Sequence, residues 1–112
     1  MGIGKNKYRN KPMMIGDIRF DSQAEAMHYQ RLLADPSVKE ILLQPKFLLQ
    51  EKFTHAKTGA KHQAITYVAD FDVTYYGDRR EIQDVKGMKT EVFKLKMKLF
   101  DYRYPDLILR LI

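Results

Sequence analysis

The chain has 112 residues, of which 45% are apolar, and this length predicts one domain with a modest core. No stretch approaches the roughly 18 consecutive apolar residues of a membrane span, and the absence of cysteine excludes disulfides and thiolate metal sites. The net charge of +6 suits a polyanion such as nucleic acid, although a soluble protein with a lysine-rich surface would carry the same charge.

The N-terminal segment is basic. Residues 1–12 contain Lys5, Lys7 and Arg9 without any acidic residue, which predicts a flexible arm able to contact DNA. The segment lacks the apolar stretch of a secretory signal, so we expect a cytoplasmic protein without a membrane partner. We expect residues 13–112 to form a single domain.

The first elements after this arm are a strand and a helix. Met13–Phe20 predicts a short strand, with Gly16 as part of a turn signal. Ser22 is a good N-cap for a helix that runs to about Ala34 and that Pro36 stops.

Three extended stretches follow the helix. Glu40–Phe53 predicts a long strand that is bent or interrupted near Pro45, and the polar stretch His55–His62 predicts a loop. Ala64–Tyr76 is dense in β-branched and aromatic residues and predicts the clearest strand, and Arg80–Lys86 predicts another.

The next segment, Glu91–Tyr104, fits both a strand and a helix by its pattern. Fourteen residues is long for a strand, and Thr90 can cap a helix, so we predict a helix followed by a short strand at Leu107–Leu111. The expected order of helix, three strands, helix and strand predicts an α/β (α+β) fold, with a central mixed sheet flanked by helices. Two apolar stripes at helical spacing are present, Val92, Leu95, Leu99 and Tyr102, and Phe93, Met97, Phe100 and Tyr104.

Acidic residues within the predicted strands need a reason, because strands disfavour Asp and buried carboxylates are costly unless paired or metal-bound. Alternation puts Asp70 and Asp72 on one face of their strand, and Asp84 and Lys86 on one face of the next. If the connecting loop is the three residues Tyr76–Asp78, Asp70 faces Asp84. An even-numbered loop would put the two carboxylates on opposite faces unless a bulge corrected the register.

Facing carboxylates repel each other unless a cation lies between them. Mg²⁺ takes oxygen ligands and keeps several waters, so Asp70, Asp84 and the carbonyl of Val85 could supply its protein ligands, and Mn²⁺ is an alternative. The ion would polarise a phosphate and lower the pKa of the attacking water. Lys86 would orient or deprotonate that water and stabilise charge on the transition state.

At these residues the chain resembles the PD-(D/E)XK nuclease superfamily. Asp70 is followed fourteen positions later by Asp84-Val85-Lys86, as in that pattern, although Ala69 stands where many members have proline. The upstream Ser22-Gln23-Ala24-Glu25 resembles the helix-borne glutamate of Holliday junction resolvases in this superfamily. The element order also resembles its restriction-endonuclease-like αβββαβ core.

The chain is also similar to a family of small phage- and prophage-encoded proteins assigned to this superfamily. The stretches that carry this resemblance are Phe20-Asp21-Ser22 with Glu25, Leu43-Gln44-Pro45-Lys46-Phe47, Tyr67-Val68-Ala69-Asp70-Phe71, Asp84-Val85-Lys86-Gly87 and Thr90-Glu91-Val92-Phe93-Lys94-Leu95-Lys96.

The resemblance implies a Mg²⁺-dependent endodeoxyribonuclease. It is expected to be structure-selective, like a Holliday junction resolvase, and to act as a homodimer on branched DNA in phage recombination or repair, in the bacterial cytoplasm. The implied catalytic residues are Glu25, Asp70, Asp84 and Lys86, with Glu25 acting at the metal directly or through water.

The resemblance also directs attention to residues around this site. Lys89, Lys94 and Lys98 are candidates for contacts to DNA phosphates, and Gln44 is a candidate for contact with a metal-bound water.

Simpler readings of the same residues stay open. Ser22 and Glu25 form a capping-box pattern, which would explain Glu25 without chemistry. Asp72 could replace Asp70 as the ligand, and Asp84 with Lys86 could be an exposed cross-strand charge pattern.

The surrounding residues also have simpler readings. Lys94, Lys96 and Lys98 could be a solvated helix face, and Gln44 could be structural. The three histidines have no metal-ligand spacing, so a zinc site is not expected. A non-catalytic nucleic-acid-binding module and a phage regulatory protein are the alternative functions.

Overall fold

The computed structural model describes residues 11–112, and the chain divides into two compact units, one ending at Val38 and one comprising Lys39–Ile112. Of the predicted basic arm, only Lys11 and Pro12 lie within the described residues, and both are exposed. Neither helix in this part of the chain is long and apolar enough to cross a membrane.

The first unit contains a small hairpin and a helix. The predicted strand at Met13–Phe20 is two antiparallel strands, β1 (Met13–Ile15) and β2 (Ile18–Phe20), because Gly16 adopts a positive φ of 59° and turns the chain. The helix α2 (Gln23–Ala34) begins as predicted, with the Ser22 hydroxyl accepting a hydrogen bond from the backbone N–H of Glu25.

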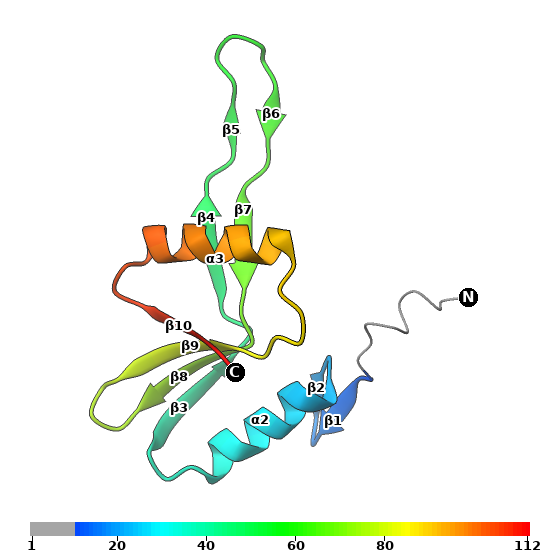
Figure 1. The fold of residues 1–112 in the computed structure, drawn as a ribbon, viewed down its shortest axis with the longest axis vertical. Coiled ribbons are helices and arrows are strands. Elements are labelled where there is room, and N and C mark those ends of the chain that lie inside the picture. Colours follow the sequence, from blue (N-terminus) through cyan, green and yellow to red (C-terminus); the bar gives the residue numbers. More distant parts are fainter. Residues whose placement is uncertain (1–10) are drawn as a thin grey trace. The chain divides into compact units, whose positions relative to one another are not determined.

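The second unit is built on a central mixed sheet of four strands in the order β10-β9-β8-β3 (Figure 1). The hairpin strands β8 and β9 are antiparallel, whereas β9 and β10 are parallel and are connected through the helix α3. The predicted class, α+β with two helices and a central mixed sheet, is therefore confirmed for the described residues. The strands and helix of this sheet are β3 (Val38–Leu43), β8 (Phe71–Tyr75), β9 (Arg80–Asp84), α3 (Glu91–Arg103) and β10 (Ile108–Leu111).

Both of the long predicted strands are interrupted. The first becomes β3 and β4 (Lys46–Gln50) on either side of Pro45, as expected. The stretch predicted as one strand from Ala64 to Tyr76 is instead β7 (Ile65–Val68) and β8, which belong to different sheets. The two breaks lie opposite each other, because the Gln44 N–H donates to the carbonyl of Asp70 over 3.0 Å.

The core of this unit lies between α3 and the strands. One of the two apolar stripes predicted for the helix packs inward, through Phe93 and Phe100, and the other remains mostly exposed. The buried cluster comprises Phe47, Leu49, Tyr67, Ala69, Ile82, Phe93 and Phe100.

Two further short strands extend β4 and β7 away from α3 (Figure 1). They are β5 (Phe53–Thr54) and β6 (Lys61–His62), which pair antiparallel. The prediction of a loop over residues 55–62 is therefore wrong at its end, because Lys61 and His62 belong to this hairpin.

Candidate active site

The β8–β9 hairpin has the register on which the metal hypothesis depends. Asp72 pairs with Ile82, and the Tyr75 N–H donates to the Arg79 carbonyl over 2.7 Å, so the loop has three residues as predicted. Gly77 (φ 93°) and Asp78 (φ 68°) supply the two positive φ angles of this turn. The same register, continued past the end of β8, places Asp70 opposite Asp84.

Asp84 is the deepest of the candidate residues. Its residue surface is only 2% exposed, so the alternative of an exposed charge pattern is wrong. Its Oδ2 accepts a hydrogen bond from the hydroxyl of Tyr67 in β7 and lies 3.9 Å from the Lys86 ammonium. The carboxylate is thus held between a hydroxyl donor and a lysine at the end of the hairpin.

Other buried carboxylates of this sheet have a different kind of partner. Both oxygens of Asp72 accept hydrogen bonds from the Arg80 guanidinium, at 2.9 and 2.7 Å. Glu81 is 2% exposed, and one of its oxygens lies 3.0 Å from both Arg79 and Arg110. Because Arg80 engages both oxygens of Asp72, the structure favours Asp70 over Asp72 as a metal ligand.

The Glu81 carboxyl shows what such pairing does. Burial raises its pKa, but hydrogen bonds from Gln83 and Arg110, together with the charges of Arg110 and Arg79, outweigh burial and lower the pKa below its ordinary value. The printed partners of Asp84 are a neutral hydroxyl and a lysine at 3.9 Å, which is a weaker match for a buried negative charge.

Asp70 lies at the break between β7 and β8, where it is partly buried. Its Oδ2 accepts a hydrogen bond from the backbone N–H of Val85 over 2.7 Å, which ties this carboxylate to the residue that follows Asp84. Two strands therefore bring Asp70 and Asp84 together at one end of the hairpin.

Lys86 completes this cluster. Its side chain is 31% exposed, and its ammonium lies 4.5 Å from the centre of the buried Phe93 ring in α3. The ring and the Asp84 carboxylate together fix the direction of a side chain that otherwise has four rotatable bonds.

The remaining predicted residues lie in several places. Glu25 lies in the first unit, in the first turn of α2, and its N–H caps the helix. Gln44 is exposed at the break beside Asp70, with a positive φ of 52°. Lys5, Lys7 and Arg9 lie outside the described residues.

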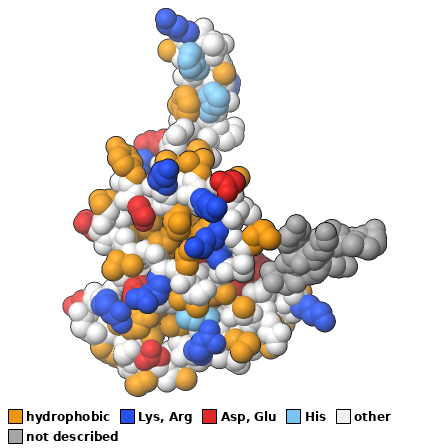
Figure 2. All heavy atoms as spheres, viewed as in Figure 1, with side chains coloured by type: hydrophobic (Ala, Val, Ile, Leu, Met, Phe, Trp, Pro, Cys, Tyr) orange, Lys and Arg blue, Asp and Glu red, His pale blue; other side chains and the backbone are white. Residues whose placement is uncertain are grey.

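The lysines near α3 are accessible. Lys89, Lys94 and Lys98 are exposed, and Lys94 forms an ion pair of 3.1 Å with Glu91. Figure 2 shows Lys and Arg side chains over the face that carries α3, with hydrophobic side chains exposed between them. This surface accommodates both the solvated-face reading and contacts to phosphates.

The donors of the hairpin fit a hard divalent cation. Asp70 and Asp84 offer carboxylate oxygens on neighbouring strands, and Mg²⁺ is commonly bound by one or two carboxylates together with water and substrate phosphate. Among residues 11–112, no group of three or more His, Asp or Glu side chains is gathered so as to hold a metal ion by itself. A cation at this hairpin would therefore need main-chain, water or substrate oxygens as well.

Two contributors to this site are absent from the sequence-based prediction. Tyr67 was expected only in the core, yet its hydroxyl donates to Asp84, and Phe93 contacts the Lys86 ammonium. Strict alternation puts Tyr67 and Asp70 on opposite faces, and no feature of the sequence marks the break that brings Tyr67 to Asp84.

Comparison with known proteins identifies a family. The family described as "Protein of unknown function (DUF1064)" matches residues 5–112. No curated protein and no solved structure matches the chain. Since the match spans nearly the whole sequence, the chain belongs to the DUF1064 family.

Proposed function

We propose that the protein is a metal-dependent endonuclease that hydrolyses DNA phosphodiester bonds. The observation that supports this most directly is the hairpin register, which sets Asp70 against Asp84 with Lys86 beside them. Two adjacent carboxylates and a lysine are the side chains that phosphodiester hydrolysis with a divalent cation requires. The resemblance to PD-(D/E)XK nucleases adds Glu25 as a fourth catalytic residue.

In this proposal each residue has a defined role. Asp70 and Asp84 would hold the cation together with the Val85 carbonyl, and Glu25 would contribute directly or through water. Bound Mg²⁺ supplies a polarised phosphate and a water of lowered pKa. Lys86 orients the attacking water and stabilises the negative charge that develops on the phosphate oxygens.

Tyr67 acts as a positioning residue. Burial, the hydrogen bond to Asp84 and the negative charges of Asp84 and Asp70 all raise the pKa of the Tyr67 hydroxyl far above its ordinary value. The hydroxyl therefore stays protonated and keeps donating to Asp84 at any pH at which the protein is folded. One oxygen of Asp84 is thereby held in a fixed direction.

The decisive experiment is a cleavage assay with end-labelled four-way junction, flap, duplex and single-stranded DNA. We expect paired symmetric cuts in the junction with Mg²⁺ or Mn²⁺, and background levels in EDTA, because the carboxylates need a cation to act on a phosphate. Gel mobility shift in EDTA measures binding to the same substrates separately.

A non-catalytic nucleic-acid-binding protein is the second candidate. It is supported by the burial of Asp84, whose residue surface is 2% exposed and whose carboxylate already accepts from Tyr67. Binding of all four DNAs without cleavage in either metal would contradict the nuclease proposal for these substrates and favour this candidate.

We also propose that the protein acts as a homodimer, since two symmetric nicks need two sites. The outer stripe of α3 supports this, because Val92, Leu95 and Tyr102 are 64%, 55% and 86% exposed. Apolar side chains in a row on one helix face are typical of an interface.

The dimer is tested by light scattering on the purified protein. Leu95→Glu is expected to convert a dimer to a monomer at micromolar concentration, because it places a charge within the apolar stripe. Ile108→Glu, which changes an apolar side chain that is 56% exposed on β10, is the matched control and should stay dimeric. A wild-type protein that is monomeric throughout would contradict the dimer.

A further inference from the structure

The hairpin of β5 and β6, with the residues that flank it, forms an arm comprising residues 51–64. Every residue of this arm is exposed, and none belongs to the buried cluster of the unit. The chemistry of its side chains is therefore not explained by packing, in contrast to β4 and β7, which carry Phe47, Leu49 and Tyr67 into the core.

An aromatic pair lies on one face of the arm. Phe53 and His62 are directly opposite each other in the strand register, and their rings stack with centroids 4.8 Å apart and planes inclined by 23°. Phe53 is 47% exposed. Flat rings held rigidly at the surface are the platforms on which unpaired nucleobases stack.

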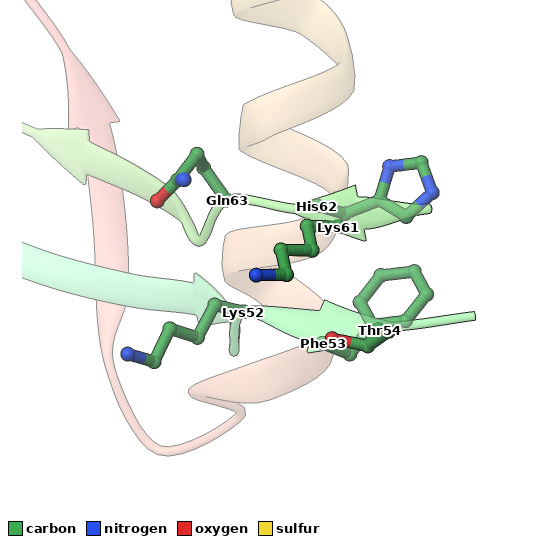
Figure 3. A pocket seen from close by; sticks show the side chains of 6 residues that line it. All are labelled: Lys52, Phe53, Thr54, Lys61, His62 and Gln63. Atoms are coloured by element: carbon green, nitrogen blue, oxygen red, sulfur yellow. The ribbon is translucent and has the colours of Figure 1, made fainter. Parts of the chain in front are cut away.

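The arm is also basic. From Lys52 to Gln63 it carries Lys52, Lys57 and Lys61 and no acidic residue. Figure 3 shows the Lys52 and Lys61 ammonium groups pointing to the same side, away from the two rings. These residues line a hollow of about 390 Å³ together with Phe53, Thr54, His62 and Gln63.

The combination of rings and lysines discriminates between partners. An acidic peptide would satisfy the lysines but would leave the ring faces exposed to water. The base edges of duplex DNA are stacked inside the helix, so the duplex would offer phosphates alone. A single strand presents phosphates and free base faces together, and therefore matches both features of the arm.

We propose that the arm binds an unpaired DNA strand, with a base stacked on the Phe53–His62 pair and phosphates against Lys52 and Lys61. This inference rests on the proposed nuclease function only for the choice of DNA as the polymer. It gives the enzyme a means to prefer branched DNA, whose junctions and flaps offer unpaired bases, over plain duplex.

The test measures binding of the full-length protein to fluorescein-labelled oligothymidylate by anisotropy, in EDTA so that no cleavage occurs. Phe53→Ala is expected to weaken binding by about 5- to 150-fold, the loss that corresponds to one stacked base. Thr54→Ala, the next residue on the same exposed strand, is the matched control and should bind as the wild type does.

Two further measurements separate stacking from charge. A 2-aminopurine placed in the oligonucleotide should be quenched on binding by the wild type and not by Phe53→Leu, which keeps an apolar side chain but removes the ring. Lys52→Gln and Lys61→Gln should each lower the slope of log affinity against log salt by about 0.7 without abolishing the quenching.

Several results would overturn the inference. These are equal binding by Phe53→Leu and the wild type, full competition by polyglutamate at equal charge concentration, and tighter binding of the matching oligouridylate than of the DNA. Because the assay runs without a metal, the arm can bind DNA in a protein that cuts none. Conversely, junction cleavage that is unchanged in Phe53→Ala would leave the nuclease proposal intact.

Discussion

Replacing Asp84 with Asn is expected to lower the rate of junction cleavage on the order of 10²- to 10³-fold, the loss typical of removing one preorganised charged group from an active site. The substitution keeps the size of the side chain and its acceptor oxygen for the Tyr67 hydroxyl, so the hairpin should keep its shape. What is lost is the negative charge that would hold the cation next to Asp70. Single-turnover cleavage at saturating protein measures this effect directly.

The matched control is Asp72→Asn. Asp72 is also a buried carboxylate of the hairpin, 6% exposed, but its oxygens are bonded to Arg80. We expect this variant to cut at the wild-type rate at a temperature at which both proteins are folded. Cleavage lost in Asp72→Asn and retained in Asp84→Asn would transfer the catalytic role to the wrong carboxylate for this proposal. DNA binding in EDTA should be retained by both variants.

Replacing Phe100 with Ala is expected to destabilise the protein by about 3–5 kcal/mol, the range for truncating a buried phenylalanine. Phe100 is fully buried, and its ring lies 5.0 Å from that of Phe47 and 5.9 Å from that of Tyr67. The cavity would open beneath the ring whose hydroxyl holds Asp84. Urea denaturation followed by circular dichroism gives the change in the free energy of unfolding.

Lys98→Ala in the same helix is the control, since this side chain is exposed and surface substitutions usually change stability by less than about 0.5 kcal/mol. Phe100→Leu should fall between the two, because it restores much of the volume. If Phe100→Ala unfolds at the same urea concentration as Lys98→Ala, the buried cluster around α3 is not the core of this unit.

The register of the catalytic hairpin was predictable from local chemistry. Side chains alternate with a period of two, so a loop of three residues suffices to set Asp70 against Asp84. The loop length is encoded by Gly77 and Asp78, two residue types that tolerate positive φ. Helix α3 was predictable for a similar reason, because Thr90 caps it and its inner stripe recurs at helical spacing.

The break between β7 and β8 was not predictable in this way. Residues on both sides of Ala69 and Asp70 have the composition of a strand, and the interruption coincides with the bend at Pro45 in the partner strand. It is thus a consequence of pairing between segments distant in sequence. Because the break changes the alternation of faces, it also conceals the contact between Tyr67 and Asp84.

The exposed arm has a consequence for how members of this family can differ. Residues 51–64 contribute no buried side chain, so the turn around Gly59 can gain or lose residues at little energetic cost. The reach of the arm can then change by several ångströms while β4, β7 and the carboxylates of the hairpin keep their positions. Substrate span and catalytic chemistry are separately adjustable in such an architecture.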